Sequence, residues 1–150
     1  MPEYTQQDIA FMRMAIAEAR NCTSVESAYN VGAVITDGTQ VLSTGYSRQF
    51  PGNTHAEQCA LMALADKNIS TANTTMYTTM EPCSTRLSGN VPCVKRVLNA
   101  KIARVFVGVA EPPNFVHCTG IEELRNHGVQ VIVISELEDE CKALNCHLAK

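Results

Sequence analysis

Two short runs in the C-terminal half of the chain most constrain its fold. Arg104 to Ala110 (RVFVGVA) has the β-branched composition of a fully buried strand, and Val129 to Ile134 (VQVIVI) forms a second strand. The segment between them holds a loop and an expected helix, Ile121 to His127, which Gly128 would end. This connection is far too long for a hairpin and long enough for a right-handed crossover. The two strands are therefore expected to be parallel.

The rest of the chain also alternates helices with strands. Periodicity and turn signals predict a helix capped by Thr5 with Asp8 and running to about Arg20, a hairpin of Val31 to Ile35 and Val41 to Gly45 around Asp37-Gly38, a helix from His55 to Lys67, a strand from Thr75 to Met80, a helix from Val91 to Ala100, and a last helix from about Ser135. Such alternation implies an α/β sheet with helices on both faces. We expect a five-stranded mixed sheet whose last strands are parallel.

Composition favours one domain over residues 1–150. The chain is 45% hydrophobic and 18% charged, and a chain of 150 residues can bury a core without disulfides. Its formal net charge is −3 and its basic residues are scattered, which argues against a nucleic-acid partner. No apolar run approaches the ~20 residues of a membrane span, and the N-terminal pattern is not that of a signal peptide. We therefore expect a cytoplasmic or nuclear protein without a membrane partner.

The chain contains seven cysteines. Their odd number and the lack of a secretion signal favour reduced thiols, of which a subset binds metal, over a disulfide framework. The cysteines are Cys22, Cys59, Cys83, Cys93, Cys118, Cys141 and Cys146.

The candidate chemistry lies in the segments His55-Ala56-Glu57, Pro82-Cys83 and Pro92-Cys93. A catalytic zinc takes three protein ligands and leaves its fourth position for water. His55, Cys83 and Cys93 supply such a set, and both thiols are expected near helix N-termini, where their pKa is lowered. Glu57 lies about 200° around the helix from His55, so it can reach the zinc-bound water instead of the metal. We expect one zinc ion per chain, with Glu57 as the catalytic residue that relays protons.

These residues match the H-x-E and P-C elements of the zinc-deaminase signature, and the chain resembles the cytidine-deaminase-like superfamily. Nucleoside, tRNA and polynucleotide deaminases keep about two to four residues between the cysteines. Here a longer loop containing glycine joins Cys83 to Cys93. Residues 51–61 (PGNTHAEQCAL) and 81–93 (EPCSTRLSGNVPC) look like the pyrimidine deaminases of riboflavin biosynthesis, the fungal branch in particular. The segments 31–34 (VGAV), 104–109 (RVFVGV) and 111–112 (EP) are also similar.

The resemblance implies a three-layer α/β/α fold, a catalytic zinc and hydrolytic removal of an exocyclic amine from a ribitylamino-pyrimidine phosphate. Members of this superfamily resemble dimers or tetramers, and we expect a homodimer. Two departures affect the substrate contacts, because bacterial relatives carry Asn-Pro where this chain has Ala28-Tyr29, and His where it has Ser47. The loop between the cysteines could reach along the ribityl chain, with Arg86 suited to the phosphate. The expected substrate-binding residues are Ser47, Asn53, Ser84, Arg86 and Asn90.

Other interpretations remain open at the level of sequence. Cys59 could close a purely structural zinc site, although buried cysteines commonly pack as small hydrophobes. Cys118 beside His117, or Cys141 with Cys146-His147, could form a second metal site or be incidental thiols. A nucleoside or tRNA deaminase is the rival enzyme, disfavoured by net acidity and the wide cysteine spacing. A catalytically silent zinc-stabilised interaction module is the rival from another class, disfavoured by Glu57.

Overall fold

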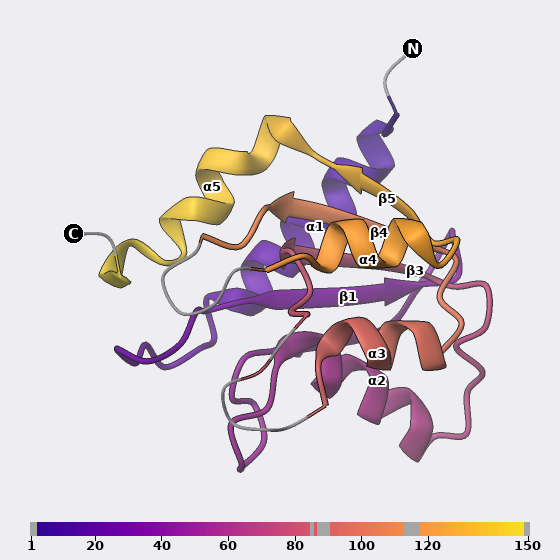
Figure 1. Ribbon diagram of the computed structural model, residues 1–150, viewed down its shortest axis with the longest axis horizontal. Coiled ribbons are helices and arrows are strands. Elements are labelled where there is room, and N and C mark those ends of the chain that lie inside the picture. The colour runs from indigo at the N-terminus through magenta and orange to yellow at the C-terminus, as the bar shows by residue number, and fades with distance from the viewer. Residues whose placement is uncertain (1–2, 85, 87–90, 113–117, 149–150) are drawn as a thin grey trace.

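The computed structural model describes residues 3–84, 86, 91–112 and 118–148 (Figure 1). The predicted order of helices and strands is confirmed. The elements are α1 (Gln6–Ala19), β1 (Gly32–Thr36), β2 (Val41–Tyr46), α2 (Ala56–Asp66), β3 (Thr75–Met80), α3 (Cys93–Asn99), β4 (Arg104–Val109), α4 (Gly120–Asn126), β5 (Gln130–Val133) and α5 (Glu138–Ala143), with short 3-10 turns at Ser135–Leu137 and Cys146–Leu148.

The strands form one five-stranded sheet in the order β2-β1-β3-β4-β5. Strand β1 is antiparallel to both β2 and β3, whereas β3, β4 and β5 are mutually parallel. The expected mixed sheet with parallel last strands is therefore confirmed. Because β3 and β4 are parallel, their carboxyl ends lie together at one edge of the sheet, where ligand sites of open α/β sheets are commonly found.

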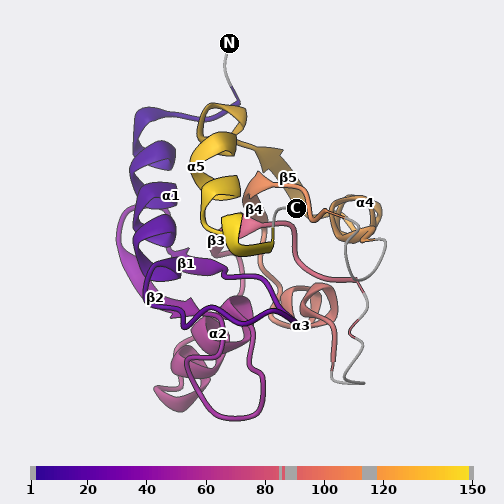
Figure 2. The same cartoon turned by 90° about the vertical axis from the view of Figure 1, so that its left-hand side faces the viewer.

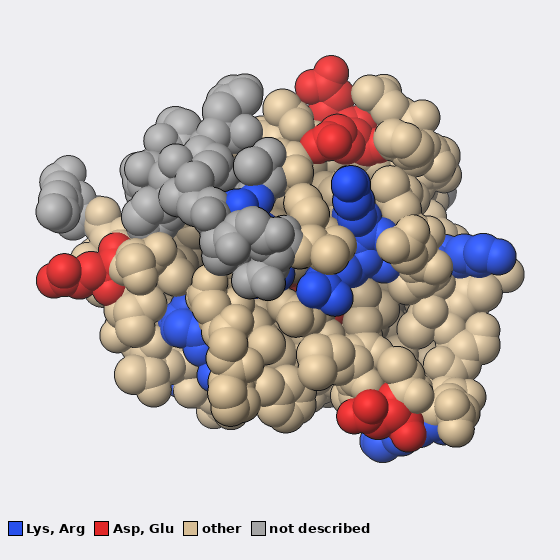
Figure 3. Space-filling model, turned by 60° about the horizontal axis from the view of Figure 1, so that its bottom comes forward, with Lys and Arg blue, Asp and Glu red and all other residues tan. Residues whose placement is uncertain are grey.

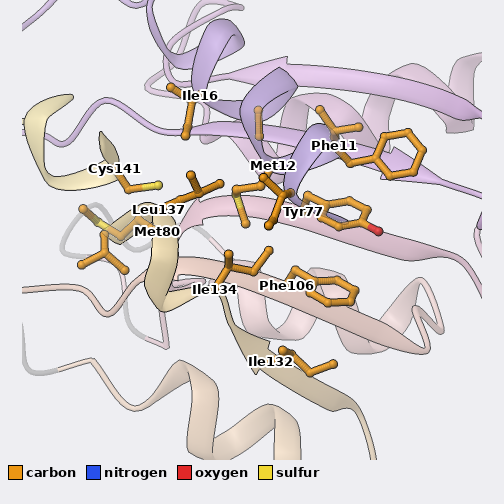
Figure 4. Close-up of a cluster of buried hydrophobic side chains, with 14 residues drawn as sticks. Phe11, Met12, Ile16, Tyr77, Met80, Phe106, Ile132, Ile134, Leu137 and Cys141 are labelled. Carbon is orange, nitrogen blue, oxygen red and sulfur yellow. The ribbon is translucent and has the colours of Figure 1, made fainter. Parts of the chain in front are cut away.

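Helices cover both faces of the sheet, which confirms the three-layer arrangement (Figure 2). On one face, α1 and α5 pack over a cluster in which Tyr77 stacks on Phe106 at 4.8 Å between ring centroids (Figure 4). The Tyr77 hydroxyl donates a 2.6 Å hydrogen bond to Asp8 Oδ1, and Asp8 also completes the capping box with Thr5 at the start of α1. The cap predicted from the sequence thus also satisfies a polar group in the core.

The opposite face carries α2, α3 and α4 over a second apolar cluster. Strand β2 approaches the first turns of α2 so closely that a Cβ on Gly45 would collide with the carbonyl oxygen of Ala56. Only glycine allows this approach, which holds the N-terminus of α2 against the sheet. His55 caps that N-terminus with an extended backbone conformation, so the fold of the β2–α2 unit determines where its imidazole lies.

Several boundaries differ from the sequence predictions. The helix expected from Val91 begins at Cys93, because Pro92 has an extended backbone with ψ of 148° and caps the helix instead of joining its first turn. All six residues of β3 are buried, although three of them are threonines besides Tyr77. This strand is central and covered on both sides.

Within the described ranges, none of the helices is long and apolar enough to cross a membrane.

Candidate metal centre and active site

Three potential metal ligands converge where β3 ends and where α2 and α3 begin. His55 is the N-cap of α2, Cys83 follows β3, and Cys93 is the first residue of α3. His55 Nδ1 lies 3.6 Å from Cys83 Sγ and 3.4 Å from Cys93 Sγ. All three ligand atoms lie within 4.8 Å of one another. Residues that are distant in the sequence are therefore brought to one point by the end of β3 and the first residues of two helices.

This donor set fits a tetrahedral zinc ion. With bonds of about 2.3 Å to sulfur and about 2.0 Å to nitrogen, sulfur and nitrogen ligands lie about 3.5 Å apart around the metal. The two measured separations match this value. No other cluster of this kind occurs among the described residues, and the cluster does not include Cys59, whose side chain is fully buried. His117, invoked for a second metal site, lies outside the described residues.

Hydrogen bonding distinguishes the two thiols. The Cys93 backbone N–H donates a 3.2 Å hydrogen bond to Cys83 Sγ, at the N-terminus of α3. Hydrogen bonds from the Cys93 thiol and backbone, together with His55, lower the pKa of the Cys83 thiol. The hydrogen bond to Cys83, followed by burial, raises the pKa of Cys93. A metal ion that binds both thiols displaces their protons.

Glu57 lies in the first turn of α2, beside the three ligands, and is 4% exposed. Burial raises the pKa of its carboxyl group to about 7, while His55 opposes the shift and the charge of Cys83 adds to it. A carboxyl group that titrates near neutral pH can both accept and donate a proton, which is the property of an efficient general acid–base group.

The predicted substrate-binding residues make contacts within the protein. The Ser47 hydroxyl hydrogen-bonds the backbone of Val31, and Ser84 Oγ accepts a 3.0 Å hydrogen bond from the Thr119 N–H. The carbonyl of Asn53 accepts from the buried Arg86. Asn90 lies outside the described residues. The assignment of these residues to substrate stays a prediction.

Glu81 accepts hydrogen bonds from backbone N–H groups of two other segments. Its Oε1 accepts from the Glu111 N–H at 3.1 Å, and its Oε2 accepts from the Ile121 N–H in the first turn of α4 at 2.9 Å. A Cβ on Gly120 would collide with the carbonyl oxygen of Pro82. The start of α4 therefore lies in close contact with the segment that follows β3. Glu81 therefore anchors the segments flanking residues 113–117 to the strand end that carries Cys83.

Glu111 is a further titratable group near the candidate site, and its position after β4 is the only signal the sequence contains. Burial raises the pKa of its carboxyl group to about 8, and the charges of Cys83, Glu81 and Glu57 add to the shift. The carboxyl ends of β3 and β4 thus carry several acidic groups close to the proposed metal ligands.

The sheet order and the His-Cys-Cys-Glu constellation together define a cytidine-deaminase-like protein. Residues 5–109 match the family described as the cytidine and deoxycytidylate deaminase zinc-binding region. The chain therefore belongs to this family, and the resemblance predicted from its motifs is confirmed.

The similar proteins include enzymes of riboflavin biosynthesis. The chain is 42% identical over 143 residues to the diaminohydroxyphosphoribosylamino-pyrimidine deaminase of Schizosaccharomyces pombe, covering 94% of this chain and 35% of that protein. It is 32% identical over 141 residues to the chloroplastic riboflavin biosynthesis protein PYRD of Arabidopsis thaliana, covering 92% of this chain and 31% of that protein. The chain thus spans about a third of the length of these curated relatives.

Solved structures support the same relationship. The Rib2 deaminase of Aspergillus oryzae, in complex with DARIPP, superposes with a TM-score of 0.81 at 28% identity, covering 94% of this chain and 91% of that one. The bifunctional deaminase and reductase of Thermotoga maritima gives a TM-score of 0.85 at 30% identity, covering 95% of this chain and 40% of that one. The dCMP deaminase of cyanophage S-TIM5, at 23% identity and a TM-score of 0.67, shares the fold.

Proposed function

We propose that this chain is a zinc-dependent deaminase that hydrolyses the exocyclic amine of the diamino-ribitylamino-pyrimidinone phosphate precursor of riboflavin and releases ammonia. The observation that carries the proposal is the convergence of His55, Cys83 and Cys93 beside the buried Glu57. The substrate class is supported by the Schizosaccharomyces pombe relative and by the Aspergillus oryzae deaminase, whose structure contains DARIPP.

In this proposal His55, Cys83 and Cys93 hold one zinc ion per chain. When bound, zinc lowers the pKa of a water molecule toward about 7 and acts as a Lewis acid. Glu57 would accept a proton from the attacking water, whose oxygen would form a bond to the ring carbon bearing the amine. The protonated Glu57 carboxyl would then donate this proton to the adjacent ring nitrogen. Glu57 would take the remaining proton of the added oxygen and pass it to the amine, so that the carbon–nitrogen bond breaks, ammonia leaves and the oxygen becomes the carbonyl oxygen of the product.

The loop between Cys83 and Cys93 distinguishes this proposal from deamination of a free nucleoside. A loop of this length can extend along a ribityl chain toward its phosphate. Ser47, Asn53, Ser84, Arg86 and Asn90 are proposed to line the substrate site, directly or through the loops that they hold.

We further propose that residues 1–150 form one domain that works in the cytoplasm as a homodimer, without a nucleic-acid partner. The chain contains twelve Lys and Arg residues and fifteen Asp and Glu residues, which gives no excess of positive charge for a nucleic acid. On the face shown in Figure 3, several Lys and Arg side chains lie near the centre, and most Asp and Glu side chains lie toward the margins. A groove of about 700 Å³ between α2 and α3 supports the dimer, because the exposed side chains of Met62, Ile69 and Val91 line it. Sedimentation analysis tests the oligomeric state.

A chromatographic assay tests the activity. The purified zinc-loaded protein is incubated with the ribitylamino-pyrimidine phosphate, with cytidine and with a tRNA anticodon stem, and ammonia and product are measured. We expect turnover of the pyrimidine phosphate alone. Turnover of cytidine or of the tRNA stem would contradict the proposed substrate class. Turnover of none of the three compounds would favour a catalytically silent zinc module.

A further inference from the structure

Arg86 is a buried cation placed among the segments that carry the metal ligands. Its side chain is 8% exposed, and no ion pair of Arg86 occurs among the described residues. Burying a guanidinium without a carboxylate partner carries a desolvation cost, which hydrogen bonds must offset. The identity of the acceptors therefore indicates what this residue does.

Two acceptors of Arg86 lie on the chain segments that lead to His55 and to Cys93. Its Nη2 donates to the carbonyl oxygen of Asn53 at 2.8 Å, shortly before His55 in the chain. Its Nη1 donates to the carbonyl oxygen of Val91 at 3.3 Å, shortly before Cys93. Arg86 itself follows Cys83 closely in the sequence. One guanidinium thus connects all three ligand-bearing segments.

A third acceptor connects Arg86 to His55 through one side chain. Nη1 also donates to Gln58 Oε1 at 3.2 Å, and the same oxygen accepts the His55 backbone N–H at 3.3 Å. Asn53 has a left-handed backbone with φ of 58°, so its carbonyl direction is set by an unusual turn that the guanidinium stabilises. The position of the His55 imidazole consequently depends on Arg86 through two routes.

We propose that Arg86 is a positioning residue for the metal centre, holding the His55, Cys83 and Cys93 segments in register through Asn53, Gln58 and Val91. The inference rests on the proposed function and adds a role for Arg86 other than phosphate binding. The planar guanidinium suits it, because a rigid fork donates to several acceptors in fixed directions, which a lysine ammonium does not reproduce.

Two substitutions test the role. Arg86→Lys keeps the positive charge and most of the volume, and Arg86→Ala removes the side chain. Arg13→Ala is the matched control, since Arg13 is 54% exposed and pairs only with Glu140 at the surface among described contacts. Chelator competition measures zinc affinity without any substrate. We expect both Arg86 variants to lose about tenfold or more in zinc affinity, as residues that support metal ligands typically do, and the control to be unchanged.

Kinetics separate positioning from phosphate binding. With zinc in excess, we expect kcat of the Arg86 variants to fall by the same factor for the phosphorylated pyrimidine and for its dephosphorylated form. Unchanged zinc affinity, or a loss confined to KM for the phosphorylated compound, would overturn the proposal. If the wild type deaminates neither compound, the proposed function fails, while the zinc measurement still decides the role of Arg86.

A double-mutant cycle tests the route through Gln58. If Arg86 acts partly through this side chain, the zinc affinity lost in Arg86→Ala with Gln58→Ala is smaller than the product of the two single losses. Gln58→Glu retains an acceptor oxygen for both donors and should preserve affinity better than Gln58→Ala. Independent effects in the cycle would remove Gln58 from the proposal.

Discussion

Glu57 shows how one buried residue obtains its chemistry from its surroundings. Its position in the helix turns it away from the ligand direction of His55, and burial brings the pKa of its carboxyl group to about 7. The spacing of His55 and Glu57 is a local property of the chain. The burial that adjusts the pKa is a property of the fold.

Glu57→Gln is expected to keep zinc and fold while losing nearly all turnover. The amide fills the same volume but cannot accept and relay protons, and loss of general acid–base catalysis usually costs about 10²–10⁴-fold in rate. Steady-state kinetics and zinc analysis of the same preparation measure both effects. The exposed Glu26→Gln, which removes a carboxylate elsewhere, is the control. A variant retaining more than about a tenth of the rate would assign the relay to another group.

Glu111 is expected to make stability depend on pH. Its folded-state pKa of about 8 lies above the ordinary value of 4.5, so the folded protein retains a proton that the unfolded chain releases between these values. The contribution of Glu111 to the free energy of unfolding therefore falls as pH rises from about 4.5 to about 8. Glu111→Gln should flatten the dependence, with a larger stabilisation relative to wild type at the alkaline end.

Urea unfolding of chelator-treated wild type and Glu111→Gln at about pH 5 and about pH 8.5 measures this effect. Contributions of titratable groups that do not interact with Glu111 cancel in the comparison between the two proteins. An equal free-energy difference at both pH values would show that Glu111 does not titrate in this range in the folded state.

Among the elements, β3 and α4 are joined in part by one carboxylate. Glu81 lies at the end of β3 and accepts from backbone N–H groups on either side of residues 113–117. Hydrogen bonds to charged groups contribute about 1.5–3 kcal/mol each. The position of α4 against the ligand-bearing strand end therefore relies on Glu81 as well as on apolar packing.

Glu81→Gln is expected to destabilise the protein by about 1.5–3 kcal/mol, because the amide keeps one acceptor oxygen and turns an NH2 group toward a backbone N–H. Denaturant unfolding of the zinc-loaded protein measures the change. Glu122→Gln on the exposed surface of α4 is the control and should lie within about 0.5 kcal/mol of wild type. Equal stabilities for the two variants would mean that the Glu81 hydrogen bonds do not hold α4 in place.

At the scale of the whole molecule, metal binding and folding are coupled. His55, Cys83 and Cys93 come together only when α2, β3 and α3 have assembled on the sheet. A metal that binds only the folded state stabilises it by its binding free energy. The proposed zinc is therefore a structural as well as a catalytic component.

Cys93→Ala is expected to lose zinc and to unfold at the denaturant midpoint of the chelator-treated wild type or below it. Elemental analysis and denaturant unfolding measure the two effects. Cys146→Ala, at an exposed cysteine, should retain both metal and stability. Full zinc occupancy in the Cys93 variant would exclude this residue as a ligand.

Local signals in the sequence are enough to predict the order of elements and the candidate metal-binding cluster. The Thr5 and Asp8 cap, the apolar runs at 104–110 and 129–134, and the spacing of His55 and Glu57 depend on neighbouring residues. The long cysteine spacing indicated the same group of relatives that the comparisons identify. These features can be predicted from the sequence because helix periodicity, strand composition and motif spacing depend on short stretches of chain.

Tertiary structure decided what the remaining polar residues contact. Arg86 donates to Asn53, Gln58 and Val91, and Glu81 accepts from Glu111 and Ile121, all partners from other segments of the chain. A sequence shows that such residues can donate or accept, but their partners depend on how loops from several elements meet. Burial, which sets the pKa of Glu57, likewise exists only once both layers of helices have closed over the sheet.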